Sequence, residues 1–214
     1  MKGLAIQAFI RRLMNRAPFR CAMASMGGVG STALARHIGS IVDKTEREHA
    51  FSPVLFSAET NLRIGYLYGN PYNAVASVFR RNYQDMHVRA MNAGSGTHPA
   101  MLSGVSLEAY LERGADEFNM ERQFDNWVNH APSHAPVILI KYETLAEHIP
   151  EVLKFFACRY PFEVKQRRTT WRDQPEPVRK GLERIYGGLL AKVEAMPPIK
   201  ILYPVGMENL NEYA

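Results

Sequence analysis

Residues 20–32 read RCAMASMGGVGST, and this stretch decides the fold. Residues 20–25 form a short apolar segment, and residues 26–32 form a glycine-rich turn. The apolar residues between 33 and 42 then recur at helical spacing. The order of strand, glycine turn and helix is typical of α/β proteins that bind an anion where the helix begins.

The glycine turn has the chemistry of a phosphate or sulfate site. The first N–H groups of a helix are unpaired, and the helix dipole adds positive charge there. Glycines let the backbone curl around an anion, and Ser31 and Thr32 add hydroxyl donors. A tight turn with a serine cap is the alternative interpretation. The residues predicted to bind the anion are Gly27, Gly28, Val29, Gly30, Ser31 and Thr32.

Strand and helix patterns alternate along the rest of the chain. Strands are predicted at residues 63–68 and 136–141, with a weaker apolar run at 53–57, and helices at 72–91, 107–111, 117–129 and 178–193. Ser106 is the expected N-cap of the second helix, and Thr144 is expected to form a capping box with Glu147. This alternation predicts a three-layer α/β/α fold with a central parallel β-sheet.

Charge and length bound the organisation of the chain. The 214 residues include 26 Lys and Arg against 21 Asp and Glu, and five of the basic residues lie among the first twenty. The remaining chain is balanced, which argues against a general nucleic-acid binder. We expect a basic amphipathic segment at 1–19, one α/β domain at 20–205 and a tail at 206–214.

The termini and cysteines bear on location. The pattern of residues 6–14 predicts a short amphipathic helix that packs on the domain, or alternatively touches an anionic membrane surface peripherally. No stretch approaches the length of a membrane span, and no signal peptide is evident. Cys21 and Cys158 fit a reducing compartment, so we expect a cytoplasmic protein.

Four segments together resemble the sulfotransferases that use 3′-phosphoadenosine 5′-phosphosulfate (PAPS). Residues 27–32 are similar to the loop that binds the 5′-phosphosulfate in that family. Residues 64–77 resemble its 3′-phosphate segment, a strand followed by Asn-Pro and by a helix with a serine six residues later. Residues 137–145, a strand ending in Tyr-Glu-x-Leu, and residues 170–172 match in the same order, so the resemblance spans about residues 20–195.

The resemblance implies a P-loop sulfotransferase-like fold and a PAPS-dependent activity without a metal. The acceptor would be a hydroxyl or amine on a small molecule, lipid or carbohydrate. Ser77 would bind the 3′-phosphate, with Arg81 and Arg172 as nearby cations. His49, or Glu48 beside it, would be the catalytic base.

Two departures keep other functions open. Gly28 and Gly69 stand where the family has basic residues that contact the donor. One alternative is therefore an inactive, sulfotransferase-like binding module. Another is a kinase or NTPase with a degenerate loop, although Gly30-Ser31-Thr32 lacks the lysine of the Gly-Lys-Ser/Thr that ends a Walker A sequence.

Overall fold

The computed structural model describes residues 19–40, 44–45, 49–56, 61–132, 134–165 and 171–207. Its centre is an open sheet with the strand order β2-β1-β3-β4-β5. The strands are β1 (Arg20–Ser25), β2 (Lys44–Thr45), β3 (Leu62–Tyr68), β4 (Val137–Lys141) and β5 (Ile199–Leu202). The first four are parallel, and β5 pairs antiparallel with β4. The chain is thus an α/β protein with a mostly parallel sheet, and β5 is an edge strand that the sequence analysis did not predict.

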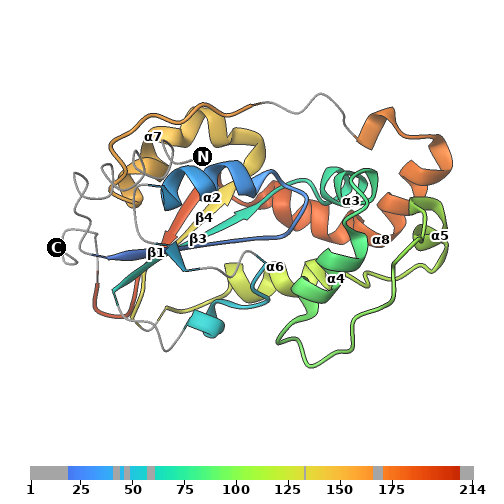
Figure 1. Ribbon diagram of the computed structural model, residues 1–214, viewed down its shortest axis with the longest axis horizontal. Coiled ribbons are helices and arrows are strands. Elements are labelled where there is room, and N and C mark those ends of the chain that lie inside the picture. The colour runs from blue at the N-terminus through green and yellow to red at the C-terminus, as the bar shows by residue number, and fades with distance from the viewer. Residues whose placement is uncertain are drawn as a thin grey trace, which may run out of the picture.

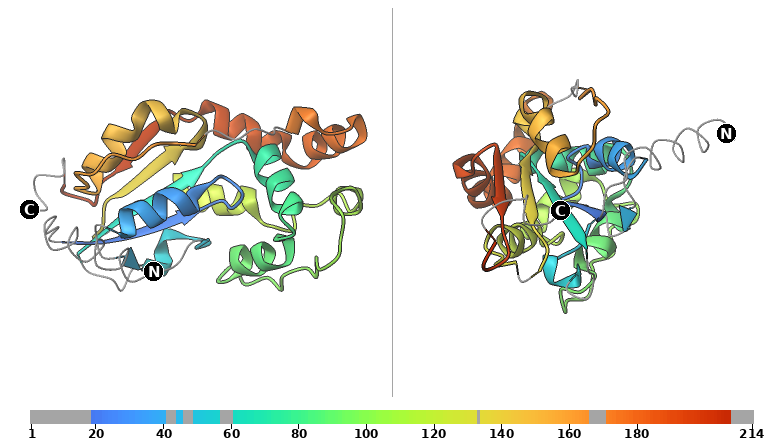
Figure 2. Two further views of the ribbon diagram at one scale, coloured as in Figure 1. Left: turned by 45° about the horizontal axis from the view of Figure 1, so that its top comes forward. Right: turned by 90° about the vertical axis from the view of Figure 1, so that its left-hand side faces the viewer.

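Helices lie on both faces of this sheet. Figure 1 shows α2 and α7 above it and α6 below it, and the tilted view of Figure 2 agrees. The helices are α2 (Ser31–Gly39), α3 (Pro71–Arg80), α4 (Gln84–Asn92), α5 (Leu107–Glu112), α6 (Met120–Val128), α7 (Leu145–Phe155) and α8 (Glu176–Ala195). A helix layer on each side is the arrangement expected for a parallel sheet whose strands are apolar throughout.

Strand β3 shows how the two faces are filled. All seven of its residues are buried. Successive side chains of a strand point to opposite faces. Tyr66 stacks on Trp127 of α6 with ring centroids 4.7 Å apart. A side chain at Gly65, on the opposite face, would meet Phe156 at the end of α7 and Met23 of β1.

The parallel pairing sets the position of the candidate site. β1 and β3 are neighbours in register from Arg20 with Leu62 to Ser25 with Leu67. β1 continues into the glycine turn and α2, and β3 continues through residues 69–70 into α3. Both turns therefore lie at the carboxyl edge of the sheet, where ligands bind in open α/β folds.

Two predicted elements are wrong in part. Residues 53–57 were predicted as a weak strand, but Pro53–Phe56 form a 3-10 helix, and a proline has no N–H to donate to a strand ladder. The helix predicted from residue 72 to 91 is two helices, α3 and α4. The break falls at Asn82, which adopts a left-handed φ of 54°.

The two predicted N-caps have different outcomes. Ser106 is confirmed as the cap of α5, since its Oγ accepts the N–H of Ala109 at 3.2 Å. The capping box at Thr144 is wrong. Thr144 Oγ1 instead donates to the carbonyl of Lys141 at 3.4 Å, because a short 3-10 turn at Tyr142–Thr144 precedes α7.

The predicted amphipathic helix within residues 1–19 lies almost wholly outside the described residues, as does most of the tail at 206–214. None of the helices that the structure describes combines the length and apolar composition needed to cross a bilayer.

Candidate functional site

The glycine turn folds into a backbone cradle at the start of α2, in which Gly27, Gly28 and Val29 are buried and Gly30 is exposed. Gly27, Gly28 and Gly30 have left-handed φ angles of 78°, 63° and 76°. Gly30 is the N-cap residue of α2, and no side chain caps the first helical N–H groups there. The turn therefore presents backbone donors in the way that anion sites at helix N-termini require.

The cradle rests directly on the first turn of α3. A Cβ atom at Gly28 would lie 2.7 Å from the carbonyl carbon of Ala74 and 2.8 Å from its Cα atom. Only a glycine allows this backbone contact. The glycine turn before α2 and the first turn of α3 consequently lie side by side.

Behind the cradle, a chain of hydroxyls leads to His49. Ser31 Oγ donates to Ser25 Oγ at 2.9 Å, and Ser25 Oγ lies 3.2 Å from Nδ1 of His49. The N–H of Gly27 also points to Ser25 Oγ, at 3.4 Å. The predicted base and the predicted anion loop are thus connected through Ser25, which the sequence analysis assigned only to a strand.

Helix α6 fixes the segment that carries His49. The side-chain amide of Gln123 donates to the carbonyls of Ser25, His49 and Ala50 at 3.1–3.3 Å, and its Oε1 accepts the hydroxyl of Tyr66. The indole of Trp127 donates to the carbonyl of Ala50 at 3.0 Å. Gln123 is fully buried. A glutamine four residues before Trp127, on the apolar face of a predicted helix, was the available signal for this role.

A second histidine, His87 of α4, packs between His49 and the cradle. Its ring centroid lies 4.6 Å from that of His49, and a Cβ at Gly27 would lie 2.8 Å from its Cδ2 atom. Nδ1 of His87 donates to the carbonyl of Tyr83 at 3.1 Å. Burial, together with the neighbouring His49, lowers the pKa of His87 to about 4, so the ring is neutral at pH 7.

Ser77 and Arg81 follow Ala74 along α3. Residues 74, 77 and 81 share one helical face, and Ser77 is 7% exposed. Arg81 donates from Nε to the carbonyl of Ser77 at 3.1 Å, and its guanidinium lies over the ring of Tyr83. Ser77 therefore lies one turn beyond the cradle contact, whereas Arg81 belongs to the junction of α3 and α4.

The turn before α3 contacts a carboxylate from the segment after β4. The N–H of Asn70 donates to Glu143 Oε1 at 2.8 Å. A side chain at Gly69 would meet both carboxylate oxygens of Glu143, at 2.9 and 3.0 Å. The position where the resemblance places an arginine is thus next to a negative charge. Asn70 also caps α3, because its Oδ1 accepts the N–H of Asn73.

Trp171, in the last of the four segments that resemble the sulfotransferases, also contacts the start of α3. The backbone N–H of Trp171 donates to Asn73 Oδ1 at 2.7 Å, and its ring meets Tyr72 edge to face at 4.9 Å. The buried indole N–H of Trp171 has no hydrogen-bond partner among the described residues. Arg172 is exposed and stacks over the Trp171 ring. Trp171 and Arg172 thus lie beside the start of α3.

The other predicted site residues differ in exposure. Val29 is buried, whereas Thr32 is exposed at the start of α2. Glu48 lies outside the described residues.

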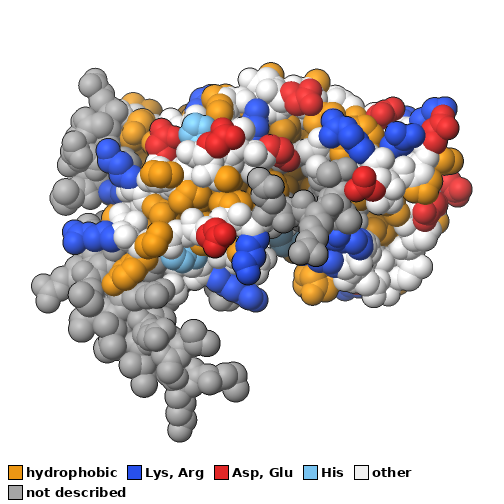
Figure 3. Space-filling model, turned by 90° about the horizontal axis from the view of Figure 1, so that it is seen from above, with side chains coloured by type: hydrophobic (Ala, Val, Ile, Leu, Met, Phe, Trp, Pro, Cys, Tyr) orange, Lys and Arg blue, Asp and Glu red, His pale blue; other side chains and the backbone are white. Residues whose placement is uncertain are grey.

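Within the part of the chain that the structure describes, no three His, Cys, Asp or Glu side chains are grouped to hold a metal ion. On the face seen in Figure 3, Lys and Arg side chains are interspersed with Asp and Glu.

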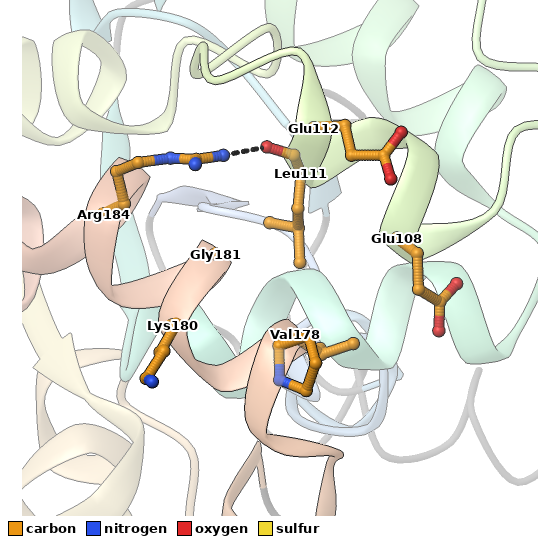
Figure 4. Close-up of a pocket in the computed structure, with 8 residues that line it drawn as sticks. Glu108, Leu111, Glu112, Val178, Lys180, Gly181 and Arg184 are labelled. Carbon is orange, nitrogen blue, oxygen red and sulfur yellow. Dashed lines mark hydrogen bonds between the residues drawn. The ribbon is translucent and has the colours of Figure 1, made fainter.

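A cavity of about 410 Å³ lies elsewhere, between α5 and α8. Figure 4 shows Arg184 of α8 pointing to the carbonyl of Leu111, to which it donates a hydrogen bond, with Glu108 and Glu112 on the α5 wall. None of the predicted site residues lines this cavity.

Comparisons of the chain with protein-family models, with curated proteins and with solved structures find no match, so the site is interpreted from its own geometry.

Proposed function

We propose that this protein is a cytoplasmic sulfotransferase that moves a sulfuryl group from PAPS to a hydroxyl or amine acceptor. The contact between Gly28 and Ala74 carries the proposal, because it joins an uncapped helix start to the first turn of a second helix. A donor with phosphate groups on both sides of its ribose needs two adjacent anion sites. The resemblance of residues 27–32 and 64–77 to the family's donor-binding segments supports the same assignment.

The residues of the cradle would hold the sulfated phosphate. Backbone N–H groups of residues 28–32 and the hydroxyls of Ser31 and Thr32 would bind its oxygens. Ser77 would contact the 3′-phosphate. Donors fixed by the fold before the reaction stabilise charge that develops in the transition state without further reorganisation. Here that charge develops on the leaving phosphate.

His49 would act as the base. The acceptor oxygen attacks the sulfur atom, and an oxygen–sulfur bond forms. The bond from sulfur to the bridging phosphate oxygen breaks, and its electron pair stays on that oxygen. The acceptor proton passes to Nε2 of His49. Nδ1 of His49 lies 3.3 Å from the carbonyl of Ser25, which can accept a hydrogen bond from the resulting imidazolium.

Calorimetric titration tests the assignment. We expect 3′-phosphoadenosine 5′-phosphate, the desulfated donor, to bind at least about tenfold more tightly than AMP, the scale of one charged hydrogen bond. The control variant Ser40→Ala should show the same preference between the two nucleotides. Ser40 donates to the carbonyl of His37 at the other end of α2. Tighter binding of ATP with Mg²⁺ would instead support the kinase or NTPase alternative.

The carboxylate of Glu143 favours a second candidate, a binding module without sulfuryl transfer. A negative charge beside Gly69 disfavours a phosphate at the start of α3. Such a module would bind AMP and 3′-phosphoadenosine 5′-phosphate equally through the cradle alone. The same titration separates the two candidates.

A further inference from the structure

The cavity between α5 and α8 has the size and lining of a small-molecule site. Its volume of about 410 Å³ lies within the range of such sites, which are concave and largely apolar with a few polar groups. Leu111 and Val178, two buried side chains, line it. A Cβ atom at Gly181 would lie 2.9 Å from the Cβ atom of Leu111, so the two helices are in close contact here. The apolar lining of the cavity is therefore part of the core.

Charged side chains surround this apolar lining. Glu108 and Glu112 come from α5, and Lys180 and Arg184 come from α8. In Figure 4 the two glutamates and Arg184 lie on opposite sides of Leu111. A ligand in the cavity would therefore meet carboxylates on the α5 side and cations on the α8 side.

The cations near the cavity each have a partner, whereas the carboxylates do not. The contacts of the cations are Lys180 with Glu176 at 2.7 Å, Arg113 with Glu117 at 3.2 Å, and Arg184 with the carbonyl of Leu111. Within the part of the chain that the structure describes, neither Glu108 nor Glu112 has an ion pair or a side-chain hydrogen bond. The protein thus leaves the negative charge of α5 uncompensated.

The position of Glu112 is unfavourable for the helix itself. Glu112 is the last residue of α5, where the helix dipole disfavours a negative charge. It also lies four residues after Glu108, at a spacing where like charges repel each other. Residues that break local rules without a compensating contact are expected at functional sites. A cationic ligand would supply the compensation that the fold lacks.

We propose that this cavity binds a small organic amine, with the ammonium group at Glu108 and Glu112 and the apolar body against the buried lining. An ammonium group has three donors, which suits two carboxylates one helical turn apart. The guanidinium of Arg184 repels a cation from the α8 side and so sets the orientation of the ligand. No residue of the glycine cradle lines the cavity, so this site is separate from the proposed transfer reaction.

Three probes of similar size test the proposal. They are 2-phenylethylamine, 2-phenylethanol and 3-phenylpropanoate, which are cationic, neutral and anionic at pH 7. Each is titrated into the full chain, and NMR follows the amide signals of the residues that line the cavity. We expect the amine to bind about three- to tenfold more tightly than the alcohol, the range of two partly screened ion pairs. The carboxylate should bind most weakly. Equal affinity for the three probes, or no change at these amides with millimolar amine, overturns the proposal.

A double variant separates the charge of the site from its shape. With both Glu108→Gln and Glu112→Gln, the protein should bind the amine and the alcohol equally, and its affinity for the alcohol should be unchanged. Glu147→Gln, at an exposed position of α7, is the matched control and should keep the preference for the amine. A preference that survives in the double variant overturns the role of the two carboxylates.

The single variant Glu112→Gln tests whether the charge is uncompensated in the protein without ligand. Its denaturation midpoint should equal or exceed that of the wild type, because the variant removes an unfavourable charge from the end of α5. A clear decrease of the midpoint would show that the fold already provides a partner for Glu112 and would overturn the proposal.

Discussion

The backbone N–H of Asn70 donates to the carboxylate of Glu143, which joins the end of β3 to the turn that follows β4. The two segments belong to separate matching motifs, 73 residues apart in the chain. They meet because β3 and β4 are parallel neighbours whose carboxyl ends lie at one edge. The same contact sets a negative charge where the proposed donor carries its 3′-phosphate.

Glu143→Gln should therefore tighten binding of 3′-phosphoadenosine 5′-phosphate. Glutamine keeps an oxygen for the Asn70 N–H and removes the charge. We expect about a three- to tenfold gain in affinity, the range of one partly screened charge contact, and no gain for AMP. Titration calorimetry measures both ligands, with the exposed Glu147→Gln as control. An equal gain for AMP would show that Glu143 does not lie at a 3′-phosphate site.

Ser77→Ala should weaken binding of the same nucleotide. Loss of one hydrogen bond to a charged group costs about 1–2 kcal/mol, or roughly five- to thirtyfold in affinity. Adenosine 5′-phosphosulfate, which lacks the 3′-phosphate, should be unaffected. If both ligands lose affinity equally, Ser77 acts on the helix and not on the ligand.

Gly28→Ala should destabilise the fold and remove nucleotide binding. The added Cβ would strike the backbone of Ala74, and overpacking of this kind costs about 1–3 kcal/mol. The left-handed φ costs about 1–2 kcal/mol more. Gly96→Ala is a matched control, since Gly96 has a φ of 77° and nothing within 4 Å of its added Cβ. Chemical denaturation should show a larger loss for Gly28→Ala, and equal losses would refute the close contact.

Asp116→Asn should stabilise the protein above pH 6. Burial raises the pKa of Asp116 to about 6, above its ordinary value of 3.8. The folded state therefore holds a proton that the unfolded state releases, and stability falls as pH rises from about 4 to 6. A rise in pKa of this size corresponds to about 3 kcal/mol of unfolding free energy. The stability of the variant should not decline over this pH range, and denaturation at pH 4 and pH 7 measures the difference. The amide oxygen of the new side chain can still accept the Glu121 N–H.

His87→Gln should change the dependence of stability on pH in the opposite direction. The pKa of His87 is lowered from 6.5 to about 4, so the folded state binds fewer protons than the unfolded state in that range. Its contribution is complete above pH 6.5 and is lost as the pH falls toward 4, by about 3 kcal/mol at most. Stability of the variant relative to wild type should thus rise on acidification. A constant difference from pH 7 to pH 4 would show that His87 is not held neutral.

The local pattern of the chain was sufficient for the elements that frame the site. The glycine turn, β3 and β4 follow from residues adjacent in sequence, and each was predicted within one or two residues. The break at Asn82 was missed because asparagine tolerates a left-handed conformation without the glycine or proline that normally marks a turn. Strand β5 was missed because four residues beside a proline give too short a pattern.

The interior of the site depended on tertiary contacts that no local pattern contains. His49 was predicted as a base from the resemblance, and the structure adds its contacts with Ser25 and His87. Ser25 reads as one more small residue in a strand, and His87 as a histidine on an amphipathic helix. Their roles arise only where β1, α4 and α6 converge on the cradle.

The amide of Gln123 is synthesised after the residues that it holds in place. A nascent chain that stops before residue 120 contains the glycine cradle and His49, but none of the α6 donors that hold residues 49–51 in place. On the ribosome, the residues of the cradle and His49 are therefore synthesised well before the donors that hold the His49 segment. The hydrogen bonds that hold this segment can form only when helix α6 has emerged.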